Sequence, residues 1–419
     1  MNTRLITAAC VAALGFWGAV AVPAFGGFKE AAKETKPTVG VRYRFEAVEQ
    51  TGVEERAGAS TARVRFGWVM AAASEGFSVG VQADYVAKLG PEEYNSTDNG
   101  RTEFPVVADP TGFDLNQAFL RYRKGQLTVT AGRQRIAHAG QHFVGFKAWR
   151  QNEQSFDALR MQASDERMSL DYAYVARVNR IFGPGDGAQP GAWSSDSHLL
   201  RASWTPTDGH SIGAFNYLLD FENDNGPANS NATFGVDYTA AVGSLGLAAS
   251  VGRQRDWGDQ PVPYDVPYYA VETRWTPAGA KFALGWEVLG SDNGVATVQT
   301  PIGAEHIYRG WTGVATVQTP IGAEHIYRGW TDKFAAVKPA NGLEDTYVSA
   351  SGKVGPLTLA ATVHAYRSRR GGFDYGTEAG ISAAYARERL SLLLKLARYE
   401  AEQHATDTTK AWFMLGYSL

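Results

Sequence analysis

The chain has 419 residues, 46 glycines, one cysteine and a formal net charge of −3 at pH 7. This length is enough for two or three soluble domains or for one large barrel. The small net charge excludes a generally basic protein, so we expect no nucleic acid among its partners. Any binding of a polyanion would need a local concentration of arginine.

The N-terminus has the three regions of a secretory signal peptide. Arg4 precedes an apolar run from Leu5 to Val22, and the small residue Ala24 follows. This is the order of charged, apolar and cleavage regions that directs export. We predict a cleaved signal peptide over residues 1–24 and a short periplasmic segment over residues 25–38.

The single cysteine, Cys10, lies inside the predicted signal peptide. The mature chain would therefore contain no disulfide. After residue 24, no apolar run approaches the roughly 20 residues that a membrane-spanning helix needs. The mature chain must be stabilised by backbone pairing and packing.

From residue 39 onward, apolar and polar side chains alternate in about eighteen segments. A period of two is typical of β-strands, and strands of this length can cross a bilayer when they are tilted. In the hairpin over residues 114–136, Ala118 and Leu120 share one face, and Gln117 and Arg121 share the other. The segments are 39–48, 62–70, 77–85, the two arms of 114–136, 157–163, 168–178, 200–204, 212–221, 233–238, 247–253, 269–275, 281–288, 345–350, 357–366, 375–385, 390–397 and 410–419.

The linkers between these segments alternate in length. Short linkers lie at residues 73–76, 124–125, 164–167, 206–209, 277–280, 352–356 and 387–389, and the linkers between them are mostly long and polar. Alternation of tight turns with long loops is typical of an outer-membrane barrel with both termini in the periplasm. We predict an all-β fold, a single transmembrane antiparallel β-barrel over residues 39–419. A secreted soluble all-β protein is the alternative.

A bilayer offers no water to unpaired backbone groups, so strands cross it only in a closed sheet with an apolar outer face. Aromatic residues near strand ends, such as Trp68, Trp204 and Tyr417, suit the interfacial girdles of such a barrel. We therefore place the protein in the outer membrane of a Gram-negative cell. Its expected partners include outer-membrane lipid and the barrel-assembly machinery.

Residues 294–312 read GVATVQTPIGAEHIYRGWT, and residues 313–331 repeat them letter for letter. Perfect identity indicates a recent duplication or an error of sequence assembly, because structural repeats diverge. The duplication falls within the longest predicted connection between strands. Added residues there cost little closure entropy.

The motifs for catalysis and metal binding are weak. Residues 76–80 match the G-x-S-x-G nucleophile elbow, but that motif needs a helix after it, and the sequence predicts a strand. The eight histidines lack metal-ligand spacing. Asp220, Glu222 and Asp224 approach a calcium loop, but Gly226 is displaced by one position and no suitable glutamate follows. A solvated acidic loop is the alternative there, and we expect no cofactor and no enzyme activity.

The strongest chemical signal is an excess of arginine on the polar faces of the strands. Rings of arginine favour anions in pores, and the planar guanidinium suits carboxylates. The alternative is that these arginines pair with acidic residues and brace the barrel wall. The predicted pore-lining and selectivity residues are Arg42, Arg44, Arg63, Arg65, Arg121, Arg123, Arg133, Arg150, Arg160 and Arg274.

Several segments resemble the alginate export porin family. They are Leu115–Ala118, Gly132–Gln134, Phe143–Gly145, Trp149–Ala158 and Gly329–Phe334, of which Trp149–Ala158, reading WRQNEQSFDA, is the most specific. The resemblance covers most of the mature chain and implies an eighteen-stranded outer-membrane barrel with an arginine-rich pore. We expect a passive channel for anionic or polyhydroxylated solutes, with an acidic polysaccharide such as alginate as one candidate. An outer-membrane enzyme or a structural adhesin is the alternative.

Overall fold

The computed structural model describes residues 37–71, 76–304, 306–308, 323–325, 328–334 and 338–419. The predicted signal peptide over residues 1–24 lies outside this range, and so does nearly all of the predicted periplasmic segment over residues 25–38. One copy of the duplicated sequence lies mostly within the described range, and the other lies mostly outside it. The helix that the nucleophile elbow would need is absent, because Ser78 lies inside a strand.

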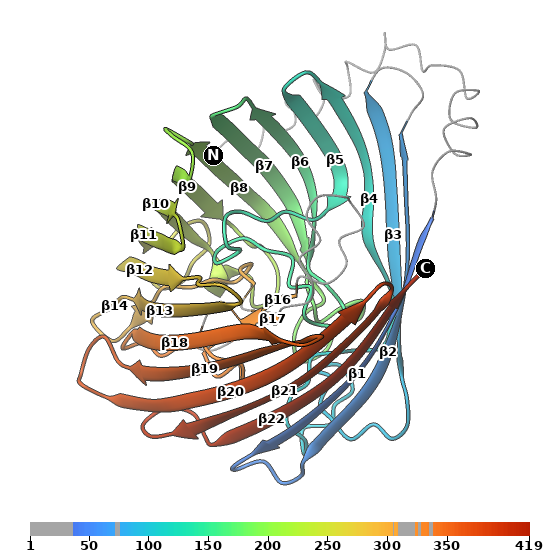
Figure 1. Cartoon of the computed structure of the whole chain (residues 1–419), viewed down its shortest axis with the longest axis vertical. Coiled ribbons are helices and arrows are strands. Elements are labelled where there is room, and N and C mark those ends of the chain that lie inside the picture. Colours follow the sequence, from blue (N-terminus) through green and yellow to red (C-terminus); the bar gives the residue numbers. More distant parts are fainter. Residues whose placement is uncertain (1–36, 72–75, 305, 309–322, 326–327, 335–337) are drawn as a thin grey trace.

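Eighteen antiparallel strands form one closed sheet, in which β1 pairs with β22 (Figure 1). This confirms the predicted fold class. The strands are β1 (Thr38–Gln50), β2 (Ala57–Ala71), β3 (Phe77–Lys88), β4 (Gly112–Lys124), β5 (Leu127–Gln134), β6 (Ser155–Ser164), β7 (Met168–Asn179), β8 (Ala192–Trp204), β9 (His210–Leu219), β10 (Asn231–Val242), β11 (Leu245–Arg255), β12 (Asp265–Trp275), β13 (Ala280–Leu289), β18 (Leu343–Val354), β19 (Leu357–Arg367), β20 (Asp374–Arg387), β21 (Leu390–Ala401) and β22 (Thr408–Ser418).

The short strands β14 (Ser291–Asp292), β15 (Ala296–Thr297), β16 (His306–Tyr308) and β17 (Ala323–His325) belong to the long connection between β13 and β18. They form two small sheets of their own, β14 with β15 and β16 with β17. In Figure 1, β16 and β17 lie within the ring of barrel strands. The connection therefore folds into the barrel.

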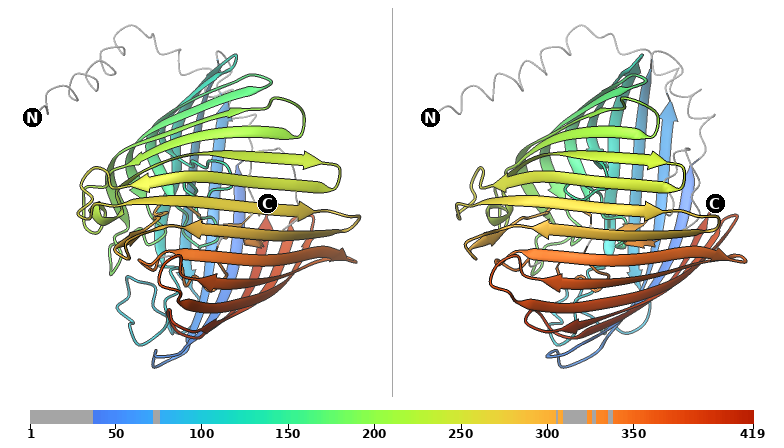
Figure 2. Two further views of the ribbon diagram at one scale, coloured as in Figure 1. Left: turned by 90° about the vertical axis from the view of Figure 1, so that its left-hand side faces the viewer. Right: turned by 60° about the vertical axis from the view of Figure 1, so that its left-hand side comes forward.

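Tight turns and longer loops alternate around the barrel, as the sequence predicts. The turn between β10 and β11, at residues 243–244, adds one tight turn to those predicted. Gly40 near the start of β1 pairs with Ser418 at the end of β22. Both ends of the barrel sequence therefore lie at the edge that carries the tight turns. Figure 2 shows that the strands are tilted within the barrel wall.

The two faces of the sheet differ in polarity as a membrane barrel requires. On β1 the side chain of Val41 is 41% exposed, whereas that of Arg42 is 4% exposed. Large apolar residues cover the outer face, and Arg42, Arg44, Glu46 and Arg63 are buried on the face that encloses the lumen. Among the described residues, no helix is long and apolar enough to cross a membrane.

The prediction for the eighth strand was too short. The alternation of polar and apolar residues predicts a strand over residues 200–204, but β8 begins at Ala192. Its first half carries serines on the lumen face, where Ser195 donates a hydrogen bond to Ser197 at 2.7 Å. Because polar residues occupy both faces of this half, the alternation that marks a strand is missing from the sequence.

We expect that deleting one copy of the duplication, residues 313–331, leaves folding nearly unchanged. Deleting either copy gives the same chain, and even halving the length of a connection changes its closure free energy by only about 0.6 kcal/mol. Thermal unfolding of the detergent-purified protein, followed by circular dichroism, should give a melting temperature close to that of the full chain.

The matched control for this deletion removes the same number of residues, 316–334, and with them the segment from Trp330 to Phe334. Phe334 is fully buried against Tyr366 and Tyr399. The control should therefore unfold at a lower temperature. Equal destabilisation by both deletions would mean that both copies have structural roles.

Candidate channel constriction

Two connections meet inside the barrel. One covers residues 135–154 between β5 and β6, and the other covers residues 290–342 between β13 and β18. We call them the short inner loop and the long inner loop. Gly145 donates its backbone N–H to the carbonyl of Ile302 at 2.9 Å, and Ala304 donates to Gln141 at 2.8 Å. The side chain of Gln154 also donates to the Ile302 carbonyl, at 3.0 Å. The two loops are therefore bonded to each other through their backbones.

The long inner loop docks with parts of both copies of the duplication. The described contacts come from residues 294–304 of the first copy and residues 328–331 of the second. The residues that flank the duplication favour docking of the start of the first copy and the end of the second. β14 precedes the first copy and pairs with β15, and Asp332 follows the second copy. Together the two pieces supply about one copy of docked sequence.

Glu378 on β20 anchors the long inner loop to the wall. Its carboxylate accepts hydrogen bonds from the backbone N–H of Trp330, from the backbone N–H of Thr331 at 3.1 Å and from the Thr331 hydroxyl. The next residue, Asp332, accepts from Lys410 on β22 at 2.8 Å and from Arg150 of the short inner loop at 3.0 Å. Asp332 therefore links the two loops and the wall.

A lysine surrounded by three tryptophans also anchors both loops. The ammonium of Lys395 on β21 lies 4.5 Å from the ring centre of Trp149, 4.0 Å from that of Trp330 and 5.0 Å from that of Trp412. Trp149 belongs to the short inner loop, Trp330 to the long one and Trp412 to β22. Cation–π attraction is strongest for tryptophan and increases when water is excluded. Both loops are thus anchored at one place on the wall.

Four of the predicted arginines reach the short inner loop from β1 and β2, and three of them, Arg42, Arg44 and Arg63, bond to residues 148–151. Arg42 donates to the Gln151 side chain and to the Ala148 carbonyl, both at 3.0 Å. Arg44 donates to the Trp149 carbonyl at 2.6 Å, and Arg63 donates to the Gln151 carbonyl at 3.1 Å. These contacts hold the Trp149–Ala158 segment, the most specific part of the family resemblance, against the wall.

Within the part of the chain that the structure describes, seven of the ten predicted arginines form ion pairs. These ion pairs fit the alternative that the arginines brace the barrel wall. Most of the arginines also lie on the lumen face of the sheet. The pairs are Arg44 with Glu46 and Asp109, Arg63 with Asp84, Arg65 with Asp84 and Glu153, Arg133 with Asp157, Arg150 with Glu46 and Asp332, Arg160 with Asp171, and Arg274 with Glu272.

Arg121 and Arg123 differ from these seven, because neither forms an ion pair within the described part of the chain. Arg121 donates to the Thr130 hydroxyl at 3.2 Å and lies over the ring of Phe119. Arg123 donates to the Thr128 hydroxyl at 3.4 Å. Both lie on β4 near its tight turn. Their charges face the lumen, and the described residues place no carboxylate in an ion pair with either of them.

Arg135 and Glu153 also belong to the constriction, although the sequence predicts a site role for neither. Arg135 Nε donates to Glu153 Oε1 at 2.5 Å, and Arg65 donates to Glu153 Oε2 at 2.9 Å. Burial alone would raise the pKa of Glu153, but the guanidiniums of Arg135 and Arg65 lower this pKa to about 2. Arg135 follows the last residue of β5, so the alternation of that strand does not predict where its side chain lies.

The calcium candidate is not assembled. Asp220 accepts a hydrogen bond from the backbone N–H of Asp259 at 3.2 Å, and Asp224 accepts one from Asn223. The described residues contain no group of three or more His, Cys, Asp or Glu side chains placed to hold a metal ion. Glu222 is exposed. In this structure the acidic residues belong to an outer loop.

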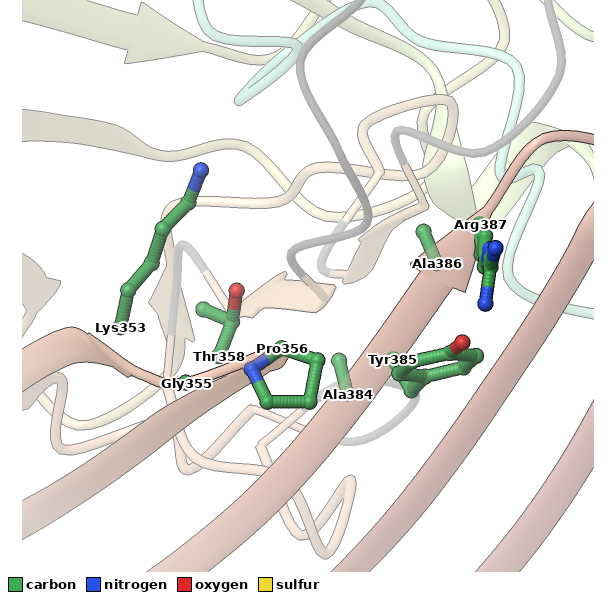
Figure 3. Close-up of a pocket in the computed structure, with 8 residues that line it drawn as sticks. All are labelled: Lys353, Gly355, Pro356, Thr358, Ala384, Tyr385, Ala386 and Arg387. Atoms are coloured by element: carbon green, nitrogen blue, oxygen red, sulfur yellow. The ribbon is translucent and has the colours of Figure 1, made fainter.

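A separate pocket of about 400 Å³ lies at the tight-turn edge, between the β18–β19 turn and the end of β20 (Figure 3). It is lined by Lys353, Thr358, Tyr385 and Arg387, together with small residues. Its lining contains no carboxylate, histidine or thiol. Among the described residues, the hydrogen bonds and ion pairs reported above are concentrated at the two inner loops.

Comparisons with known proteins agree with this architecture. A family model described as alginate export matches residues 39–258. No curated protein matches the sequence.

Three solved structures illustrate the fold. OccAB4 of Acinetobacter baumannii is 11% identical, with a TM-score of 0.65 over 92% of this chain and 98% of that one. OpdL of Pseudomonas aeruginosa is 14% identical, with a TM-score of 0.62 over 92% and 99%. OpdK of Pseudomonas aeruginosa, solved with vanillate, is 11% identical, with a TM-score of 0.67 over 92% and 99%. At these identities the likeness shows the fold alone.

We expect Glu378→Gln to loosen the long inner loop. Glutamine keeps one acceptor oxygen but turns an amide donor toward backbone N–H groups, which should weaken docking by about 1–3 kcal/mol. Trypsin cleavage after Arg328 or Lys333 should then become about tenfold faster, because cleavage follows the undocked population. Peptide mapping after brief digestion measures this rate.

Glu400→Gln on β21 is the matched control, since it makes the same chemical change at a side chain that is 63% exposed. Its cleavage rate should equal that of the unmodified protein. Identical rates for Glu378→Gln and Glu400→Gln would show that Glu378 does not hold the loop.

Proposed function

This chain belongs to the alginate export family and forms an outer-membrane barrel, and from this premise we propose that it is a passive channel for anionic or polyhydroxylated solutes. Acidic polysaccharides such as alginate are the favoured class within this proposal. The observation that carries the proposal is the excess of positive charge along one side of the lumen.

The excess lies on β4 to β10. In the sheet register, Arg121 pairs with Thr130 on β5, and Thr130 pairs with Arg160 on β6. The two arginines therefore lie on the same face of the sheet, with β5 between them. Arg160 pairs with Asp171, and Arg201 pairs with Asp237. In the half of these strands nearest the tight turns, Arg121 and Arg123 bring the total to four guanidiniums beside the two carboxylates. An anion in the lumen would be attracted to the remaining positive charge.

The inner loops strengthen this effect because they narrow the space around the charges. Fixed charges in a narrow, weakly polarisable passage raise the local concentration of the opposite ion. The planar guanidinium also suits carboxylates through paired N–H donors. Vanillate, found with the structurally similar OpdK, is an organic anion of the kind that such a surface would attract.

A barrel without conductance, serving as an adhesin or an enzyme, is the competing function. The lumen geometry favours a channel over an adhesin, because its buried charges lie inside the barrel and not on an outer loop. An enzyme would need a nucleophile with an adjacent base. The sequence pattern that came nearest, at residues 76–80, lies in the regular strand β3.

We expect the double variant Arg121→Gln/Arg123→Gln to lose anion selectivity without losing stability. In a planar bilayer with a salt gradient, the unmodified protein should give a reversal potential of anion-selective sign, and the variant should move it toward zero. The effect should weaken as salt shortens the screening length from about 10 Å at 0.1 M to about 3 Å at 1 M. The melting temperature should stay the same, because these arginines make no ion pair in the described structure.

Arg253→Gln is the control, since Arg253 lies on β11 beside the outward-facing Val251 and pairs with Asp265 outside the lumen. It removes a positive charge without changing the pore, so the reversal potential should not move. A cation-selective unmodified channel would contradict the proposal. A marked loss of stability in the double variant would instead favour wall bracing by Arg121 and Arg123.

A further inference from the structure

A basic pocket lies at the tight-turn edge of the barrel, away from the channel constriction. We call it the rim pocket. It has a volume of about 400 Å³, and Lys353, Thr358, Tyr385 and Arg387 are among its lining residues. Figure 3 shows Lys353 from β18 and Arg387 from β20 on opposite sides of the pocket. Both residues are exposed, and neither forms an ion pair within the described part of the chain. The rim pocket therefore presents positive charge from two strands.

The acids near the rim pocket do not neutralise this charge. Its lining contains no carboxylate. Glu388 lies in the adjoining turn between β20 and β21, where Arg389 follows it, and both residues are exposed. Three cations at this edge, Lys353, Arg387 and Arg389, thus stand against the single acid of the turn. The rim pocket suits an anionic group.

A larger hollow lies on the outer face of the wall beside the rim pocket, and we call it the wall groove. Its volume is about 660 Å³. The large side chains around it are apolar and between 40% and 59% exposed, and they are Phe282, Leu359, Ile381, Leu394 and Leu396. Lumen-facing residues of the same strands, such as Lys395 and Trp412, also border the groove, but their side chains are buried. The surface that the wall groove offers to lipid is therefore apolar.

Small residues explain why the wall is hollow at this place. In the sheet register, Ala350 on β18 pairs with Ala361 on β19, and Leu359 pairs with Ala383 on β20. These alanines share the outer face with the leucine. Because they do not fill the space between the large side chains, they leave room for an apolar chain.

The basic edge and the wall groove lie on one face of β20. Successive side chains of a strand point to opposite faces, so residues two apart share a face. Ile381, Ala383, Tyr385 and Arg387 follow one another at this spacing. Ile381 is 59% exposed on the outer face of the barrel. Tyr385 and Arg387 are therefore directed to the lipid side, at the tight-turn end of the groove.

The two hollows are also adjacent on three neighbouring strands. On each strand a residue that lines the rim pocket is followed or preceded in the chain by one that lines the wall groove: Lys353 and Gly352 on β18, Thr358 and Leu359 on β19, and Ala384 and Ala383 on β20. One residue of a strand spans only about 3.3 Å. A basic site at the membrane edge therefore continues into an apolar groove that runs toward the middle of the wall.

We propose that the rim pocket and the wall groove together bind one phospholipid with an anionic head group. Its phosphate lies between Lys353 and Arg387, and one acyl chain lies in the wall groove. The tight turns of an outer-membrane barrel face the periplasm, and the leaflet on that side consists of phospholipids. Guanidinium groups bind phosphate through paired N–H donors. This lipid site goes beyond the channel function and does not depend on the transported solute.

Charge selects a lipid over a second copy of this chain as the occupant. A symmetric dimer through this face would bring the same patch of both subunits together. Lys353 and Arg387 of each subunit would then meet the same cations of the other, and like charges repel. An anionic phospholipid supplies both the apolar chain and the negative charge that the two hollows lack.

Native mass spectrometry of the intact barrel, released from detergent, tests the proposal by counting bound lipids during a titration. Phosphatidylglycerol is the probe, and phosphatidylethanolamine with the same acyl chains is its counterpart. Phosphatidylglycerol should bind about fivefold more tightly, since the ammonium group of phosphatidylethanolamine repels the two cations. Glycerol phosphate, which has the phosphate without acyl chains, should not compete.

A charge variant tests the rim pocket. Lys353→Gln/Arg387→Gln should weaken phosphatidylglycerol binding by about fivefold for each cation removed. Its matched control, Lys124→Gln/Arg167→Gln, removes two exposed cations at other tight turns of the same edge. The control should bind phosphatidylglycerol as the unmodified protein does.

A filling variant tests the wall groove. Ala361→Phe should weaken the binding of both phospholipids, because both place an acyl chain in the groove. Ala249→Phe is the control, since Ala249 lies on β11 two residues before the outward-facing Val251 and outside the groove. It should leave lipid binding unchanged. If Ala361→Phe does not fold, Ala383→Leu takes its place with the same expected result.

Equal affinity for the two phospholipids would overturn the proposal, as would unchanged phosphatidylglycerol binding in the folded Lys353→Gln/Arg387→Gln variant. Competition by glycerol phosphate would show that the rim pocket takes free phosphate and would also overturn it. A dimer that Ala361→Phe separates into monomers would assign the wall groove to a second copy of the chain, against the proposal. Loss of phosphatidylglycerol binding in the charge and filling variants, with both controls unchanged, would support it.

Discussion

The structure depends on one constraint, that every backbone N–H and C=O group within a bilayer must be bonded inside the protein. Pairing of β1 with β22 meets this constraint by removing both edges of the sheet. Closure then separates the side chains into an apolar outer face and an enclosed face. The enclosed face can carry charge because it contacts other protein groups and solvent instead of lipid.

Enclosed charge raises a second problem, since each buried ion must find a partner. The barrel meets it with pairs between neighbouring strands, such as Arg160 with Asp171, and with the two inner loops. The short inner loop offers backbone carbonyls to Arg42, Arg44 and Arg63. Pore narrowing and charge compensation therefore come from the same segment. Arg121 and Arg123 take part in none of these described pairs, and the proposed anion selectivity therefore depends on them.

The period of two in the sequence was enough to predict the number of strands, because burial on one face and exposure on the other act on every residue of a barrel wall. It failed for the first half of β8, where serines occupy the buried face. The arginine positions were also predictable. Their partners were not, because Arg42 and Gln151 are 109 residues apart, and no local pattern reports which loop folds inward. Glu153 was visible only as part of a family-like motif, without a role.

We expect the eighteen strands to enclose a path that the inner loops narrow without closing. Current through single molecules of the purified protein in a planar bilayer tests this claim most directly. We predict stepwise conductance increments as folded barrels insert. Folded barrels that insert without any conductance step would contradict the claim, because the inner loops would then seal the lumen.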